Sequence, residues 1–178
     1  ARAKPGQLNF ASSGTGGSSH LAGELLKRMA NIDLTHVPYK GAAPALTDVI
    51  SGRVQLLIPT LPTVLAQVKA GRVRAIAVTA TKRSPALPEI PTVAESGVPG
   101  YEATNWYGVL APASTAKQIV GRLNAGILEV LRATDVANAL ARQGADPEGS
   151  TPEQFESYLK SEIAKWAMVI RNAGTRAD

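Results

Sequence analysis

The 178-residue chain has no cysteine, two histidines and few aromatic side chains. The lack of cysteine excludes a disulfide framework, a thiolate metal site and a cysteine nucleophile. His20 and His36 are too few for a three-histidine zinc site, and no Asp, Glu and His cluster has ligand spacing. We therefore predict no metal and no cofactor. No apolar run approaches the roughly 18 residues typical of a membrane span.

The charge balance is basic but dispersed. Nineteen Lys and Arg residues against 14 Asp and Glu residues give a net charge of +5, and aromatic residues make up 4% of the chain. A nucleic-acid surface typically shows a basic stripe with interleaved rings, and this sequence has none. We predict no nucleic-acid partner and interpret the charge as a solvated basic surface, which can also attract small anions.

In the first part of the chain, short apolar runs alternate with helical periods, and Gly, Pro or Ser stands at each change. Strands are predicted over residues 7–11, 34–39, 54–58 and 73–79. Helices are predicted between them, with Ser18 or Ser19 as the N-cap of the first. Because strands and helices alternate, we predict a three-layer α/β fold with a mainly parallel sheet and helices on both faces.

A proline-rich stretch over residues 80–100 breaks this alternation. We predict a long strand over 102–111 after it, and then helices over about 115–130, 135–143 and 151–173. Three segments have the capping-box pattern: Thr92–Glu95, Thr115–Gln118 and Thr151–Gln154. We therefore divide the chain into a lobe over residues 1–111, which includes the crossing strand, and a C-terminal helical segment over 112–178.

A loop of small residues lies between the first predicted strand and helix. Its glycines allow sharp turns that expose backbone N–H groups, and the following helix N-terminus adds positive dipole character. Two interpretations stay open: a site for a carboxylate, phosphate or sulfate, or a turn that permits close packing of helix on strand. The candidate residues are Ser12, Ser13, Gly14, Thr15, Gly16, Gly17, Ser18, Ser19 and His20.

A second loop repeats the order of strand, glycine turn and helix start. It comprises Tyr39, Lys40, Gly41, Ala42 and Ala43. In a parallel sheet both loops follow the carboxyl ends of strands, the edge at which open α/β proteins bind ligands. The alternatives are a solvated charge for Lys40 and a rim aromatic packed on the loop for Tyr39.

Serine hydrolysis is a weaker interpretation of the same residues. Ser18, Ser19, His20, His36 and Asp48 are all present, but the Gly-x-Ser-x-Gly elbow is missing around both serines. His20 directly follows Ser19, and adjacent helical residues point in different directions. For His36, in a predicted strand, we favour a hydrogen-bonded structural role.

Several segments together resemble one protein family. They are Gly6–Gly14, Ser18–Leu21, His36–Gly41, Pro44–Asp48, Ala75–Thr79, Lys82–Pro88, Pro91–Glu95 and Ala164–Trp166. The chain resembles, over nearly its whole length, the extracytoplasmic solute receptors of tripartite tricarboxylate transporters, also called the Bug family. The resemblance implies that the chain forms the second of the two lobes of a type II periplasmic binding protein, together with the C-terminal helices. The last of these helices returns toward a first lobe that is largely absent from this chain.

The resemblance also implies a function, namely capture of a small carboxylate in the periplasm and its delivery to the membrane subunits of a tripartite transporter. The ligand would be a di- or tricarboxylate, an amino acid or an aromatic acid, and the protein would not be an enzyme. An enzyme acting on a small organic acid, such as a hydrolase, is the alternative.

The family implies that both loops and Thr60 bind the ligand. Gly17 and the pair Pro59–Thr60 depart from the common family residues, which are Thr at the first position and an acid and an amide at the other two. Because the chain begins at Ala1 without Met, we expect it to be a piece of a longer protein. One expected partner of this piece is a second copy, which would form a dimer through the exposed inter-lobe surface.

Overall fold

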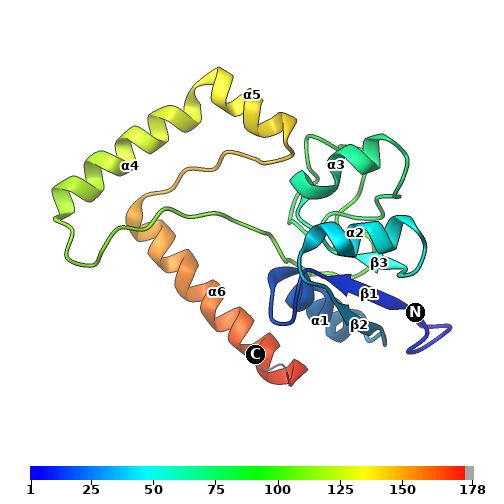
Figure 1. Ribbon diagram of the computed structural model, residues 1–178. Coiled ribbons are helices and arrows are strands. Elements are labelled where there is room, and N and C mark those ends of the chain that lie inside the picture. The colour runs from blue at the N-terminus through cyan, green and yellow to red at the C-terminus, as the bar shows by residue number, and fades with distance from the viewer. Residues whose placement is uncertain (175–178) are drawn as a thin grey trace.

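The computed structural model describes residues 1–174, and the last four residues of the predicted C-terminal segment lie outside the described part. Three short strands and several helices follow one another along the chain (Figure 1). Their bounds are β1 Asn9–Ser12, α1 Ser18–Ala30, β2 Thr35–Pro38, α2 Ala42–Ile50, β3 Leu56–Leu57, α3 Leu61–Lys69, α4 Lys117–Arg132, α5 Thr134–Arg142 and α6 Pro152–Ala173.

The strands form one parallel sheet in the order β2-β1-β3. Phe10 on the central strand pairs with His36 on one side and with Leu56 on the other. The helices α1 and α2 are the crossovers that parallel neighbours require. The predicted α/β class with a parallel sheet is therefore confirmed.

Neighbouring residues of β1 pack on opposite faces of the sheet, as the two-residue period of a strand dictates. Phe10 faces α1 and is completely buried, so closely that a methyl group on Gly23 would overlap its ring. Ala11 belongs to the other face, where it packs with Ala45 of α2 and with Val54. The sheet is thus covered on both sides, and β1 lies at its centre.

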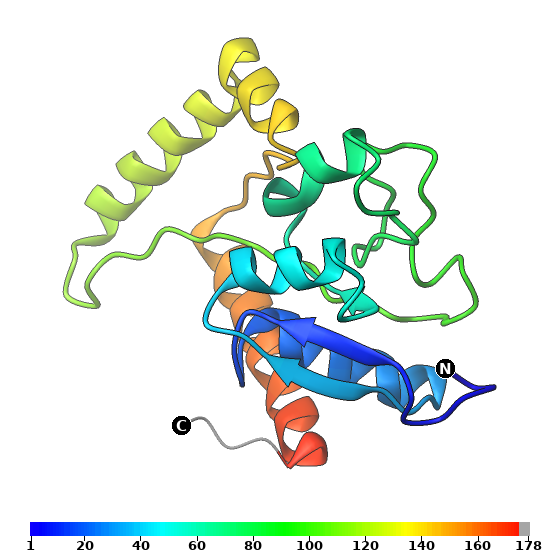
Figure 2. The ribbon, with the colours of Figure 1, turned by 45° about the vertical axis from the view of Figure 1, so that its right-hand side comes forward.

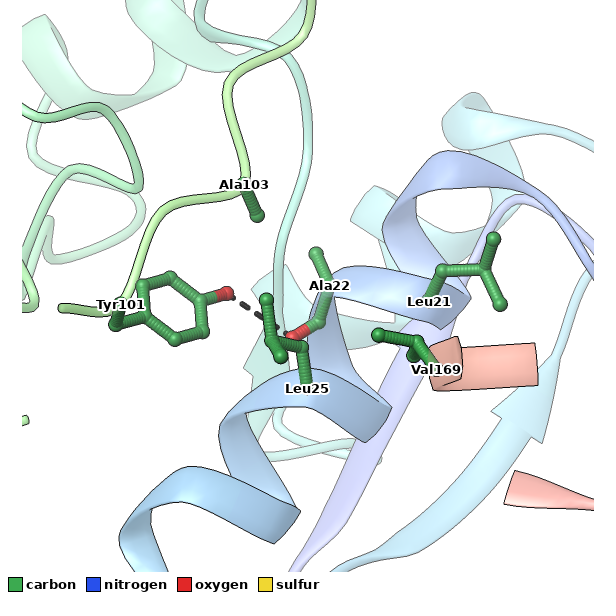
Figure 3. Packing of buried hydrophobic residues seen from close by; sticks show 6 residues of the cluster. All are labelled: Leu21, Ala22, Leu25, Tyr101, Ala103 and Val169. Atoms are coloured by element: carbon green, nitrogen blue, oxygen red, sulfur yellow. Dashed lines mark hydrogen bonds between the residues drawn. The ribbon is translucent and has the colours of Figure 1, made fainter. Parts of the chain in front are cut away.

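The outer side of α1 is covered by two segments that are distant in sequence. Figure 3 shows Leu21, Ala22 and Leu25 of α1 packed with Tyr101, Ala103 and Val169, the last from α6. The hydroxyl of Tyr101 donates to the backbone carbonyl of Ala22 at 3.0 Å, and the ring is 1% exposed. The end of the proline-rich stretch and the C-terminal helix are therefore anchored on the same helix.

The chain then leaves this core. Helices α4 and α5 lie away from the sheet, and α6 returns beside α1 (Figures 1 and 2). Neither α4 nor α5 has a buried residue. No helix within residues 1–174 combines the length and the hydropathy that crossing a bilayer requires.

The predicted strand over residues 102–111 is wrong. Ala103 donates its N–H to the Thr79 carbonyl at 2.9 Å, but residues 104–111 run without a neighbouring strand in the described part of the chain. Apolar residues favour an extended backbone there, yet a strand exists only where another strand accepts its hydrogen bonds. The predicted strand over 73–79 is likewise reduced to a single bridge between Val78 and Thr92.

Of the predicted helix caps, two form in the structure and two do not. The boxes at Thr92–Glu95 and Thr151–Gln154 form, each with both reciprocal hydrogen bonds. The third box does not, because α4 begins at Lys117 with Ala116 as its N-cap. The serine cap predicted for α1 is also wrong, since Gly17 occupies the N-cap and no side chain caps that helix.

Candidate functional site

Three helix N-termini meet the carboxyl-terminal edge of the sheet. Because β1, β2 and β3 are parallel, their ends lie at one edge, and α1, α2 and α3 begin just after them. None of these three helices has an acidic residue in its first turn, whereas α5 and α6 carry Asp135 and Glu153 there. The positive ends of three helix dipoles are therefore left without a neutralising carboxylate of their own, a setting that favours anions.

Within the first loop, four backbone N–H groups are already engaged. Ser13 donates to Ser19 Oγ (2.9 Å), Gly14 to Ser12 Oγ (3.2 Å), Gly16 to His20 Nδ1 (3.0 Å) and Gly17 to the Gly14 carbonyl (3.3 Å). These contacts give the loop a defined shape. They also remove the N–H groups of all three loop glycines, Gly14, Gly16 and Gly17, from the predicted ligand donors.

Four other donors remain. The N–H groups of Thr15, Ser18, Ser19 and His20 have no hydrogen-bond partner among residues 1–174. The side chains of Thr15 and Ser18 are exposed, so this part of the loop is open to solvent. The donors that an anion can meet are therefore those between and after the glycines.

Backbone conformation explains why glycine stands at two positions of the loops. Gly16 has φ of +78° and Gly41 has φ of +114°, a region that side chains with a Cβ rarely adopt. Neither position has an atom within 4 Å of where a Cβ would lie. The requirement at both positions is thus conformational, and it is not imposed by packing.

The second loop is hydrogen-bonded to the first. Tyr39 donates its N–H to the Ser12 carbonyl, and Gly41 donates to the Ser13 carbonyl, each at 3.0 Å. The Tyr39 hydroxyl points elsewhere, donating to Asp48 Oδ2 at 2.8 Å. This bond raises the pKa of Tyr39 and, with Arg53, lowers the pKa of Asp48. The Tyr39 hydroxyl is thus engaged within the protein.

The remaining predicted residues lie at the same edge. Lys40 is exposed, and Ala42 and Ala43 form the first turn of α2. Thr60 is the N-cap of α3, and its carbonyl accepts from the Thr63 hydroxyl at 2.7 Å. The parallel topology places Thr60 at the carboxyl-terminal edge of the sheet, but its hydrogen bonds are made with Thr63 in the same turn.

Beneath the loops lie the two histidines. Their rings stack with centroids 3.9 Å apart, and His20 is 5% exposed. His36 Nε2 lies 2.6 Å from the hydroxyl of Ser12, which is completely buried. The hydrogen bond predicted for His36 is therefore present in the structure. Sequence reasoning missed its partnership with Ser12 and His20, and the only available signal was the pairing of neighbouring strands.

The serine and histidine side chains do not form the arrangement that hydrolysis requires. Ser19 Oγ contacts Ser13, and His20 Nδ1 accepts from a backbone N–H. The one serine–histidine contact within residues 1–174, between Ser12 and His36, is beneath the loop, where Ser12 has no exposed surface.

Sequence comparison identifies the family of this fold. The family described as "Tripartite tricarboxylate transporter family receptor" matches residues 1–175. The chain belongs to this receptor family. The resemblance inferred from the loop motifs is confirmed, and the family is one of solute-binding receptors and not of enzymes.

Receptors of this family share both sequence and fold with the chain. A protein from Pseudomonas sp. (strain P51), "UPF0065 protein in tcbD-tcbE intergenic region", is 45% identical over 171 residues, covering 96% of this chain and 51% of that protein. The chain thus spans about half the length of such relatives.

Solved structures agree. Rpa4515 of R. palustris with adipate has a TM-score of 0.86 at 41% identity, covering 98% of this chain and 58% of that one. MatC from Rhodopseudomonas palustris with bound malate has a TM-score of 0.75 at 32% identity, covering 93% and 57%. The periplasmic binding protein BugD has a TM-score of 0.78 at 32% identity, covering 99% and 60%.

Proposed function

We propose that this chain is the ligand-binding lobe of a periplasmic receptor that captures a small carboxylate and delivers it to the membrane subunits of a tripartite transporter. One observation carries the proposal: the unengaged N–H groups of Thr15, Ser18 and Ser19 lie at the N-terminus of α1, on an edge where three helices begin without an acidic residue. A carboxylate supplies the acceptors and the negative charge that these groups lack.

The site residues divide by role. The three N–H groups hold one carboxylate, and the Ser18 hydroxyl can assist them. Lys40 is exposed and attracts the anion from a distance. Tyr39 shapes the second loop through Asp48, while Ala42, Ala43 and Thr60 contribute helix N-terminal backbone at the same edge.

The ligands of related receptors favour a dicarboxylate. Adipate and malate, present in two solved relatives, each carry two carboxylates. The edge described above accounts for one of them. Because the chain spans 58% and 57% of those relatives, we assign the second carboxylate to the part of the receptor outside this chain. In this division residues 1–111 form one lobe, and the segment over 112–178 leads toward the other through α4 and α5 before α6 packs back on α1.

Calorimetric titration of the full-length receptor with adipate and malate tests the proposal. Gly16→Val should abolish binding and leave the fold intact, because valine at φ +78° forces the loop to change shape. Gly52→Val is the matched control, since Gly52 also has φ of +78° and open space around its Cβ position but lies after α2, away from the loops. Gly41→Val should behave like Gly16→Val.

The result is decisive in either direction. Binding by the wild type and the Gly52 variant, but not by the two loop variants, supports the proposal. Equal affinities in all four proteins would show that the loops are ordinary turns. Turnover of a carboxylate ester that is lost on Ser18→Ala and Ser19→Ala would identify an enzyme instead.

A further inference from the structure

The two stacked histidines lie where they can control the shape of the first loop. His36 on β2 contacts Ser12 at the end of β1, and His20 on α1 accepts the Gly16 N–H. Ser12 Oγ in turn contacts both the N–H and the carbonyl of Gly14, at 3.2 and 3.1 Å. Each histidine is therefore connected to one of the two glycines that flank Thr15.

The direction of the Thr15 N–H follows from these contacts. In a trans peptide the carbonyl of one residue and the N–H of the next point in opposite directions, and the described part of the chain has no cis peptide bond. The Gly14 carbonyl points at the buried Ser12 hydroxyl. The Thr15 N–H, which belongs to the same peptide, must then point away from Ser12.

Hydrogen-bond capacity assigns the protons of the pair. A hydroxyl has one hydrogen and two acceptor positions. Ser12 satisfies all its contacts when it donates to the Gly14 carbonyl and accepts from the Gly14 N–H and from a proton on His36 Nε2. His20 Nδ1 must carry no proton, because the Gly16 N–H can only donate. His20 is thus neutral with its proton on Nε2, and His36 likewise carries a proton on Nε2.

The surroundings keep the pair neutral. Burial is the main cause that lowers the pKa of His20. For His36, burial and then the neighbouring His20 lower the pKa to about 4. The charged groups nearby are Glu24 and Lys27, both on α1. The α6 residues that line a hollow with them carry no charge: Val169, Asn172 and Ala173.

We propose that His20 and His36 are positioning residues of the binding site, which as a stacked neutral pair fix Gly14 and Gly16 from beneath and so set the direction of the Thr15 N–H. This inference rests on the proposed capture of a carboxylate at the same loop. Protonation of His20 on Nδ1 would place two hydrogens against each other at Gly16, and a second positive ring would be stacked on His36 if both were protonated. Acid therefore disorganises the loop even when the ligand stays ionised.

Paired variants of the full-length receptor separate this role from simple packing, with adipate as the probe. His36→Phe and His20→Phe keep a ring for stacking but remove the hydrogen-bonding nitrogen, and each should weaken adipate binding about tenfold, the effect of leaving a polar partner unsatisfied. His36→Gln places an N–H near the former Nε2, and His20→Asn places an oxygen near the former Nδ1. These two variants should recover most of the affinity.

The pH profile gives a second readout. Wild-type affinity should fall on acidification more steeply than that of the His20→Asn and His36→Gln double variant, which has no imidazole to protonate. Protonation of adipate itself affects both proteins equally and cancels in their ratio. Parallel profiles would overturn the neutral-pair account.

The outcomes for the proposed function and for this inference are distinct. A wild-type receptor that binds neither adipate nor malate contradicts the proposed function. A wild type that binds, with Phe variants of unchanged affinity or with Gln and Asn variants that recover nothing, overturns the positioning role. If the variants fail to fold, nitrogen-15 NMR of the wild-type imidazoles decides: protons on Nε2 of both rings at neutral pH support the inference, and any other assignment contradicts it.

Discussion

Helices α1 and α4 carry the same kind of apolar stripe, yet only α1 buries it. Leu21 and Leu25 of α1 are 8% and 7% exposed, whereas Leu123 and Val130 of α4 are 54% and 56% exposed. The helical period of apolar residues therefore predicts that a helix forms but not what covers it. In α1 the partner is the sheet, Tyr101 and α6, and for α4 no comparable partner lies within residues 1–174.

The largest difference should appear when a leucine is shortened in each helix. Leu25→Ala should lower the free energy of unfolding of this chain by about 2–5 kcal/mol, because it opens a cavity in the core. Leu123→Ala should change it by less than about 0.5 kcal/mol, as expected for an exposed position. Urea denaturation followed by circular dichroism measures both.

The same pair in the full-length receptor sharpens the comparison. If Leu123→Ala becomes as destabilising there as Leu25→Ala, the α4 stripe is covered by the rest of the protein. If its effect stays small, that stripe is a free surface. A large effect of Leu123→Ala in the 178-residue chain alone would indicate that a second copy covers it, which sedimentation velocity would then detect as a dimer.

A buried carboxylate connects α6 to the extended segment that follows Tyr101. Glu162 on α6 is 5% exposed and accepts from the indole N–H groups of Trp106 at 3.3 Å and Trp166 at 2.9 Å. Lys165 pairs with Glu162 and also with Glu102 at 3.1 Å. Although burial opposes ionisation, the bonds from Lys165 and Trp166 leave the pKa of Glu162 lowered.

Glu162→Gln should therefore cost about 1–3 kcal/mol of stability, because the partly buried Lys165 and indole donors lose a charged acceptor. Glu156→Gln on the same helix is the control, since Glu156 pairs with the exposed Lys160 at the surface and its loss should have little effect. Thermal unfolding of the two variants measures the difference, and equal melting temperatures would contradict the anchoring role of Glu162.

The histidine pair should make the lobe sensitive to acid. The pKa of His36 is about 4 in the folded chain against an ordinary value of 6.5, so the unfolded chain binds the extra proton between these values. Stability from this group is complete above about pH 6.5 and is lost as the pH falls toward 4, by less than about 1.4 kcal/mol per pH unit. Urea midpoints measured from pH 7 to pH 4 should fall less steeply in His36→Gln than in the wild type.

The smallest effect is expected at Lys40. Lys40→Ala in the full-length receptor should weaken adipate binding about two- to fivefold at low salt, and the difference should shrink as salt is added, because an exposed charge is screened. Titrations at two ionic strengths measure it. A salt-independent loss would mean that Lys40 contacts the ligand directly.

Sequence alone predicted mainly those features of the fold that depend on residues close together in the chain. The boxes at Thr92 and Thr151 formed, and all their atoms lie within four residues, although the equally local pattern at Thr115 did not form because α4 begins at Lys117. The α/β alternation of the first 70 residues also held, since each apolar run there meets a parallel neighbour. The extended run of 104–111 failed because a strand requires a partner that the local pattern does not specify.

At the site, the glycine loops and their common edge followed from the sequence, but the choice of donors did not. Which N–H groups are free depends on where Ser19 Oγ and His20 Nδ1 point. Ser19 Oγ is bonded to Ser13, and the His20 ring is stacked on His36 of β2. The sequence offered all the loop donors as equals. The fold engages Gly14 and Gly16 internally and leaves Thr15 between them available.

In the proposed site the side chains of Thr15 and Ser18 are exposed while their backbone N–H groups face the anion, so different parts of these residues set ligand preference and hold the ligand. An anion held by backbone N–H groups does not depend on which side chains those residues carry, whereas Gly23 beneath them can accept no side chain against Phe10. New side chains at positions 15 and 18 would therefore reshape the entrance to the site while the grip on the carboxylate persists. Protein engineers seeking a receptor for a different acid could begin with combinatorial libraries at these two positions.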